Sequence, residues 1–275
     1  MVVVTQCDFG ERFGGIRRVY GASASDTIAD LRLCVIGIGG VGSWAVEGLA
    51  RSGVGRITLI DNDSVCVTNV NRQIHALDST LGQSKVEVMG RRVAEINPVC
   101  QVDIIDDFLT MQTLEDYLSR GYDYVIDAID SIKFKTAMID FCRRRRLPFV
   151  TTGGAGGMTD PSLIQVADLS KTFNDPLASK VRSTLRRQYG FPRAEGKRFG
   201  VECVFSSEQP VYPQADGSVS RRKPGIHGVS LDCRFGYGSA STVTAVFGFV
   251  AASRAINRSL QRLAAHQAVE SGSVG

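Results

Sequence analysis

The chain has 275 residues and a net charge of +4, and 43% of its residues are apolar. This length is ample for one large domain with a buried core, and the composition is typical of α/β proteins. The mild net charge excludes a protein whose whole surface is strongly basic and binds nucleic acid. The charge is uneven, however, because residues 180–223 contain ten Lys and Arg against four Asp and Glu. This basic segment predicts a polyanionic substrate.

The first 152 residues alternate between apolar, strand-like runs and amphipathic helical patterns. Such a rhythm predicts βαβ units in a parallel sheet with helices on both faces, a Rossmann-like doubly wound α/β fold. Strands are predicted at residues 31–37, 56–61, 101–105, 124–128 and 148–152, and helices at 41–51, 83–96, 110–118 and 132–146.

The rhythm changes after residue 152. A Gly-rich loop, GGAGGMTDP, precedes a strand at 163–169, and Asp175 followed by Pro176 predicts the start of a helix that ends near Gln188. Another strand is predicted at 201–206, mostly turns at 206–238, and a final helix at 239–265. We therefore predict a nucleotide-binding core of residues 1–152 and an added α+β portion of residues 153–275, continuous with that core, for substrate binding and dimerisation.

Nineteen uncharged residues lie between Arg234 and Arg254. Because the first half of this stretch is rich in Gly, Ser and Thr and only about ten residues are strongly apolar, we expect a buried helix there, with membrane association as the lesser interpretation. The N-terminus lacks the basic start of a signal peptide, and none of the seven cysteines forms a CxxC pair. These features predict a cytoplasmic protein with reduced thiols and neither a disulfide framework nor a zinc knuckle.

The stretch CVIGIGGVGSW predicts a phosphate-binding turn. Gly37, Gly39, Gly40 and Gly42 lie between a strand and a helix, where glycines allow close approach and the helix N-terminus attracts a phosphate. Asp61 ends the next predicted strand, where a carboxylate meets the ribose hydroxyls of a bound nucleotide. The turn alone does not distinguish NAD from ATP.

The residues after the second strand favour ATP. Asn69, Arg72 and Gln73 lie in a short polar segment, and Lys85 begins a helix. An Arg and a Lys facing the glycine turn would neutralise a triphosphate and stabilise charge during attack at the α-phosphorus. Asp130 follows a later strand, at a position suited to Mg²⁺. Singly, these residues could equally be a solvated loop, a helix-start lysine and a helix cap, but their order favours the functional interpretation.

The motifs GIGGVG, LIDND, NVNRQ, GQSKVE and DAIDS resemble those of the ubiquitin-activating-type (ThiF-like) adenylation superfamily. The resemblance implies an enzyme that binds MgATP and adenylates a carboxylate. It assigns the phosphates to the four glycines with Asn69, Arg72 and Lys85, the ribose to Asp61, and Mg²⁺ and catalysis to Asp130. Members often lend an N-terminal arginine across a dimer interface, and Arg12 fits best here, with Arg17 and Arg18 as rivals.

Further stretches, including RFGGIRRVYG, VTTGGAGG, DPLASKVR and VECVFSSE, resemble the tRNA-modifying branch of that superfamily. The resemblance implies ATP-dependent cyclisation of threonylcarbamoyladenosine beside the tRNA anticodon, a homodimer, and a link to a cysteine desulfurase and sulfur-acceptor system. The basic segment then becomes the candidate for the tRNA backbone, with Arg182, Arg186, Arg187, Arg193, Lys197, Arg198 and Arg221–Lys223 as its cations.

Other interpretations remain open. An adenylyltransferase for a ubiquitin-like sulfur carrier needs the same ATP site, although the two CxxC pairs common in those relatives are missing. A NAD-dependent oxidoreductase and a non-catalytic scaffold are further alternatives. Cys203 is expected in the core, whereas Cys233 precedes a helix and is a candidate reactive thiol. His227 is expected in a loop, and the run Arg143–Arg146 is expected to complement a helix dipole.

Overall fold

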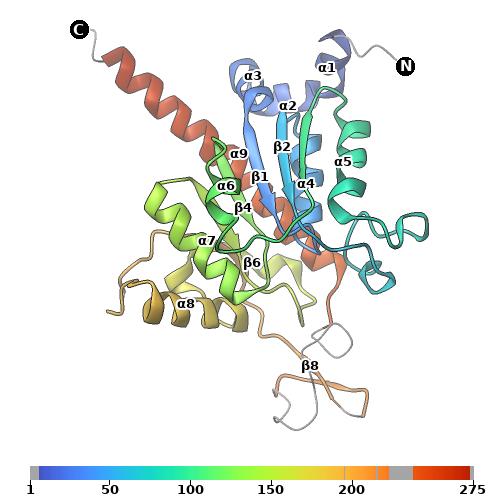
Figure 1. Cartoon of the computed structure of the whole chain (residues 1–275), viewed down its shortest axis with the longest axis vertical. Coiled ribbons are helices and arrows are strands. Elements are labelled where there is room, and N and C mark those ends of the chain that lie inside the picture. Colours follow the sequence, from blue (N-terminus) through green and yellow to red (C-terminus); the bar gives the residue numbers. More distant parts are fainter. Residues whose placement is uncertain (1–5, 195, 215, 223–237, 273–275) are drawn as a thin grey trace.

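A computed structural model describes residues 6–194, 196–214, 216–222 and 238–272, and its centre is a seven-stranded sheet with helices on both faces (Figure 1). Neighbouring strands are parallel except β6, which pairs with β7 in the antiparallel sense. The strand order β3-β2-β1-β4-β5-β7-β6 confirms the predicted mostly parallel α/β fold. The strands are β1 (Arg32–Ile36), β2 (Arg56–Ile60), β3 (Gln101–Ile105), β4 (Tyr124–Asp127), β5 (Phe149–Thr152), β6 (Ile164–Asp168) and β7 (Glu202–Ser206).

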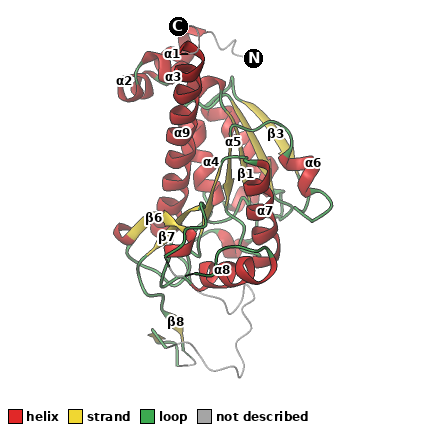
Figure 2. Cartoon of the chain, turned by 90° about the vertical axis from the view of Figure 1, so that its left-hand side faces the viewer, coloured by secondary structure: helices red, strands yellow, loops and turns green. Residues whose placement is uncertain are grey.

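The strand order reverses between β1 and β4, which are neighbours in the sheet but not along the chain. In open α/β sheets, ligands bind in the crevice outside the carboxyl ends of the strands at such a point. The edges of the sheet lie far apart, with β3 at one side and β6 and β7 at the other (Figure 2). We therefore expect a ligand site among the loops that follow β1, β2, β4 and β5.

Each face of the sheet has its own hydrophobic core. Leu33 and Val35 of β1 face one core, whereas Cys34 and Ile36 face the other, as the two-residue period of a strand requires. The first core is closed by α4 (Gly42–Arg51), α5 (Lys85–Ile96) and α9 (Ser241–Gly272), and the second by α6 (Leu114–Leu118), α7 (Ile132–Arg145) and α8 (Pro176–Gln188).

The last helix, α9, packs closely on α4. A Cβ atom on Gly248 would lie only 2.5 Å from the Val41 carbonyl oxygen, so only glycine allows this approach. Val243, Phe247 and Ala251 are buried in the first core, which confirms a buried helix for residues 241–253 of the uncharged stretch. Within the described ranges, no helix has the length and apolarity needed to cross a membrane.

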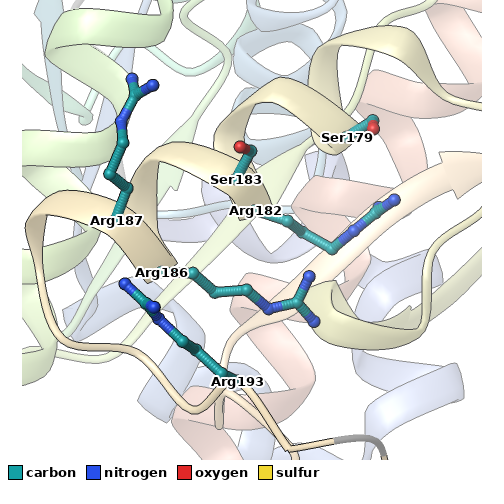
Figure 3. A pocket seen from close by; sticks show the side chains of 6 residues that line it. All are labelled: Ser179, Arg182, Ser183, Arg186, Arg187 and Arg193. Atoms are coloured by element: carbon teal, nitrogen blue, oxygen red, sulfur yellow. The ribbon is translucent and has the colours of Figure 1, made fainter.

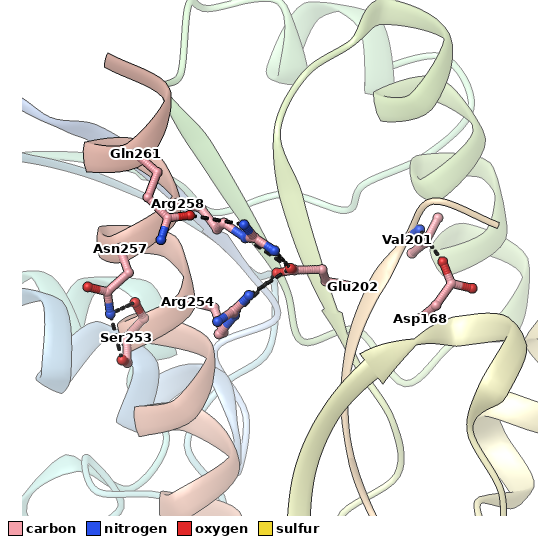
Figure 4. A network of polar contacts seen from close by, with 8 residues as sticks. All are labelled: Asp168, Val201, Glu202, Ser253, Arg254, Asn257, Arg258 and Gln261. Carbon is pink, nitrogen blue, oxygen red and sulfur yellow. Dashed lines mark hydrogen bonds and ion pairs between the residues drawn. The ribbon is translucent and has the colours of Figure 1, made fainter. Parts of the chain in front are cut away.

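Charged side chains also fix α9 to the sheet. Glu202 of β7 accepts hydrogen bonds from Arg254 at 2.7 Å and from Arg258, and Arg258 in turn donates to Gln261 at 2.9 Å (Figure 4). Burial acts to raise the pKa of Glu202, but the two guanidinium groups outweigh it and hold that pKa below its usual value. The carboxylate therefore stays ionised and joins residue 202 to the C-terminal helix.

Several boundaries differ from the prediction. Helices α1 (Gln6–Arg12), α2 (Gly14–Tyr20) and α3 (Ala22–Asp30) precede the first strand and were not predicted. Helix α6 begins at Leu114 because the hydroxyls of Thr110 and Thr113 accept from each other's backbone N–H and so replace the first helical bonds. Helix α9 continues beyond the predicted end at Ala265, and a short hairpin, β8 (Tyr212–Pro213) and β9 (Val219–Ser220), lies in the stretch predicted as turns.

Candidate functional site

The glycine turn lies where the strand order reverses. Gly37 has a φ of +85°, and a Cβ atom there would lie 2.8 Å from the Ala128 carbonyl oxygen. A Cβ atom on Gly42 would lie 1.8 Å from the Gly37 carbonyl oxygen, so neither position accepts a side chain. Helix α4 begins at Gly42 without a side-chain cap, and of its first N–H groups that of Ser43 already donates to the Gly39 carbonyl at 3.1 Å. This arrangement suits a phosphate.

Arg72 lies over this turn. A Cβ atom on Gly40 would come within 3.3 Å of Arg72 Cγ, so the extra glycine makes room for the arginine stem. The main-chain oxygen of Arg72 accepts from Trp44 Nε1 at 2.9 Å and from Thr244 Oγ1 at 3.2 Å. Its Nη1 donates to the Thr68 carbonyl at 2.6 Å. The backbone of Arg72 is therefore held by α4 and α9, and the stem of its side chain lies beside Gly40 of the glycine turn.

Asp61, directly after β2, fits the expected ribose contact. Its Oδ2 accepts from the Ile38 amide at 2.6 Å and its Oδ1 from the Asp63 amide at 2.8 Å. A carboxylate has about four lone-pair positions, so capacity remains for two hydroxyls. Burial raises the pKa of Asp61, although the positive charge of Lys85 and the two amide hydrogen bonds act in the opposite direction.

Lys85 is buried at the start of α5, beside Asp61. Its Nζ forms an ion pair with Asp63 Oδ2 at 2.6 Å, a partner that the sequence reasoning did not identify. An ammonium group has three N–H donors, so two remain for a phosphate or the Asp61 carboxylate. Asn69 is also buried, and its Oδ1 accepts from the Cys66 amide at 3.0 Å, which leaves its N–H₂ group facing other partners.

The two aspartates after β4 differ in environment. Asp127 is fully buried, and its Oδ2 accepts from Lys135 Nζ at 2.8 Å and from Thr151 Oγ1 at 2.5 Å. Asp130 is exposed, and its carboxylate has no partner within the described part of the chain. Asp127 is thus a structural residue that fixes the loop, and Asp130 is the aspartate available to a ligand. A single exposed carboxylate suits Mg²⁺, which is commonly held by one or two carboxylates and substrate phosphates.

The N-terminal arginines lie at the other end of the sheet. Arg12 Nη1 donates to the carbonyl of Ile96, the last residue of α5, whereas Lys85 begins that helix at the site. At 1.5 Å per residue, the two ends of α5 are roughly 16 Å apart. Arg12 of this chain therefore does not reach its own glycine turn, and Arg17 is paired with Asp26 at 2.9 Å. Figure 1 shows α1 at the end of the molecule opposite α8.

A basic groove of about 430 Å³ lies along α8. Arg182 and Arg186 extend side by side in one direction, whereas Arg187 points to the opposite side of the helix (Figure 3). Burial and the neighbouring charge of Arg186 lower the pKa of Arg182. Two like charges held this close favour an anionic ligand. The groove is lined by Ser179, Arg182, Ser183, Arg186, Arg187 and Arg193.

Two buried phenylalanines support the groove. Phe191 and Phe199 contact each other edge to face with centroids 5.0 Å apart, and Arg186 lies 5.2 Å above the Phe199 ring. Arg143 lies 4.3 Å above Phe191, an additional cation near the groove that was interpreted only as a helix-end charge. Asp168 Oδ2 accepts from the Gly200 amide at 2.8 Å and so anchors this loop to the sheet. Cation–π contact orders these guanidinium groups.

The remaining predicted cations do not line the groove. Lys197 and Arg198 are exposed on the loop before Phe199, and Arg221 and Arg222 are exposed at the end of the β8–β9 hairpin. Lys223, His227 and Cys233 lie outside the described residues. Cys203 is fully buried, as expected, and burial raises the pKa of its thiol.

A parallel sheet with a glycine turn at the point where the strand order reverses is typical of nucleotide-binding α/β proteins. Residues 15–271 match the ThiF family, and the chain belongs to that family. The tRNA threonylcarbamoyladenosine dehydratase of Escherichia coli K12 is 52% identical over 96% of this chain and 99% of the relative. A solved structure of the E. coli enzyme in complex with ATP has a TM-score of 0.84 at 49% identity, and covers 96% of this chain and 99% of that one.

A second kind of relative is more distant. The molybdopterin-synthase adenylyltransferase of Salmonella typhimurium is 31% identical over 50% of this chain and 54% of the relative. That likeness covers half of this chain, whereas the likeness to the E. coli dehydratase covers nearly all of it. The alternative of a sulfur-carrier adenylyltransferase is therefore not favoured.

Proposed function

We propose that this chain is an ATP-dependent dehydratase that cyclises threonylcarbamoyladenosine next to the tRNA anticodon. The strongest support is the 52% identity to the E. coli dehydratase, which extends over nearly the full length of both chains. The site's own geometry agrees, since α8, which carries the basic groove, begins beside the loop after β5, at the carboxyl end of the strands where the glycine turn also lies. Asp175, which caps α8, accepts from the Gly154 amide at 3.0 Å in the loop after β5.

Each residue of the site has a task in this reaction. The glycine turn and the start of α4 bind phosphates, and Asp61 accepts from the ribose hydroxyls. The threonyl carboxylate attacks the α-phosphorus and pyrophosphate leaves. Arg72 and Lys85 then stabilise the negative charge that builds up on the phosphate oxygens. Internal ring closure expels AMP from the activated carboxylate, so the net change in the nucleoside is the loss of one water.

Several finer assignments belong to the same proposal. Asp130 would hold Mg²⁺, which neutralises phosphate oxygens when bound. Arg12 would act at the site of a second copy in a homodimer, because it lies far from its own glycine turn. The basic groove would hold the tRNA backbone, and the enzyme would act in the cytoplasm together with a cysteine desulfurase and sulfur-acceptor system.

The nucleosides of cellular tRNA test the function. A strain without this gene should accumulate the open form of threonylcarbamoyladenosine, and a copy of the gene should restore the cyclic form. Mass analysis of digested tRNA measures both forms. If the proportion of the cyclic form is the same with and without the gene, the proposed function is wrong.

Salt should weaken tRNA binding steeply if the groove contacts phosphates. Replacing both Arg182 and Arg186 by Ala should flatten the slope of log K against log salt concentration by roughly 0.7–0.9 per lost contact. Equilibrium binding of tRNA at several salt concentrations gives the slope. The matched control is Arg91→Ala on α5, which removes an exposed arginine on another element and should leave the slope unchanged. An unchanged slope in the double variant would place the tRNA elsewhere.

A further inference from the structure

Asn71 stands between two parts of the molecule that are far apart in the sequence. Its Nδ2 donates to the Ser239 carbonyl at 2.7 Å, just before α9 begins. Its Oδ1 accepts from Arg72 Nη1 at 3.1 Å. One side-chain amide thus binds the Arg72 guanidinium and the backbone just before α9 at the same time.

Most of the other contacts of Arg72 fix its backbone and do not orient its guanidinium. Trp44 and Thr244 hold the main-chain oxygen of Arg72, and these bonds fix where the side chain begins. Among the residues that the structure describes, the guanidinium is bound only by the Thr68 carbonyl and by Asn71 Oδ1. A planar guanidinium with five N–H donors is oriented by two acceptors and still has donors for phosphate oxygens.

The backbone next to Ser239 is also hydrogen-bonded to the loop after β5. The Gly157 amide donates to the Gly238 carbonyl at 2.7 Å, and the Val211 amide donates to the Gly157 carbonyl at 2.8 Å, directly before the β8–β9 hairpin. A set of short hydrogen bonds therefore joins the loop after β5, the start of α9 and Asn71. Displacing Ser239 would displace the Asn71 amide and, with it, one of the two acceptors of the guanidinium.

We propose that Asn71 is a positioning residue that orients the Arg72 guanidinium toward the ATP phosphates and fixes that orientation to the start of α9. This assignment rests on the proposed use of ATP. The Asn71 amide does not need to touch a phosphate, since its effect passes through Arg72. A residue that acts in this way has no influence on ATP once the Arg72 side chain is gone.

A double-mutant cycle on the full chain tests the assignment, with the dissociation constant of MgATP measured by calorimetry. Asn71→Ala should weaken ATP binding about tenfold, the usual size for a lost hydrogen bond to a charged group. In an Arg72→Ala background the same change should have no effect beyond twofold. Asn257→Ala is the matched control, because the bonds of that amide stay within α9. It should leave ATP binding unchanged.

Three results would overturn the proposal: ATP binding within twofold of the parent in Asn71→Ala, an equal loss with and without Arg72, or the same loss in Asn257→Ala. Asn71→Ser, whose hydroxyl is too short to reach both partners, should reproduce the alanine result and replaces it if the alanine variant does not fold. A parent chain that binds no MgATP would refute the proposed function itself, so the two failures are distinct.

Discussion

Arg72→Ala is expected to lower tRNA-dependent formation of AMP from ATP by roughly 10²–10³-fold, the usual loss when one preorganised donor to a developing charge is removed. The variant should fold normally. Trp44 and Thr244 bind the main-chain oxygen of residue 72, which alanine keeps. The loss should therefore reflect the missing guanidinium rather than a displaced loop.

Arg72→Lys separates charge from geometry. A lysine keeps the positive charge but lacks the planar guanidinium, which binds the Thr68 carbonyl and Asn71 and has further donors for the proposed phosphate contact. We expect partial activity, between that of the alanine variant and that of the parent. Arg91→Ala, at an exposed site on α5, serves as the control and should leave AMP formation unchanged. If Arg72→Ala retains AMP formation within fivefold of the parent, Arg72 does not act on the phosphates.

The glycine turn and the first βαβ units follow from the sequence because their determinants are local. Gly37 and Gly42 are required by contacts with residues of the same turn or of the adjacent β4 loop. Asp61 follows β2 at the spacing expected for a ribose contact, and the structure puts its carboxylate on the Ile38 amide. Short-range geometry of this kind leaves a clear pattern of residue types.

Long-range arrangement leaves a weaker pattern. No local sequence pattern predicts that β7 lies between β5 and β6. That order involves contacts between residues far apart in the sequence, such as the hydrogen bond from Arg254 of α9 to Glu202 of β7. Arg187 shares the basic segment of Arg182 and Arg186, yet its position on the helix turns it to the other side. Composition predicts a basic surface, but only the position of each arginine on α8 determines the direction in which its side chain points.

The burial of Lys135 and its ion pair with Asp127 could have been predicted from the sequence. It shares the helical spacing of Met138, Ile139 and Cys142, all of them buried on α7. A lysine at such a position must find a buried partner, and Asp127 was available at the end of the preceding strand. The periodicity was used only to assign the helix, so the ion pair was missed.

Lys135→Met should therefore be the most destabilising of the substitutions considered for this chain. It leaves the fully buried Asp127 carboxylate without its cation, and breaking a buried pair from one side costs about 3–5 kcal/mol of unfolding free energy. It also removes the Lys135 Nζ donation to the Ile129 carbonyl at 2.8 Å, directly before Asp130. AMP formation should fall as well, because the loop that carries Asp130 loses its anchor.

Denaturant unfolding with Lys133→Met as the matched control measures the effect. Lys133 lies two residues away on the same helix but is exposed, so the same change of residue type there should alter the unfolding free energy by less than about 0.5 kcal/mol. Adding Asp127→Asn to Lys135→Met should recover part of the loss, because a neutral amide removes the buried charge. Its oxygen can still accept from the Ile129 amide, and its N–H₂ group can donate to the Thr151 hydroxyl, which turns to accept. A Lys135→Met variant as stable as Lys133→Met would mean that the Asp127 carboxylate needs no cation, and Asp127 would then have to be held in the core by the hydrogen bonds of Thr151 and Ile129 alone.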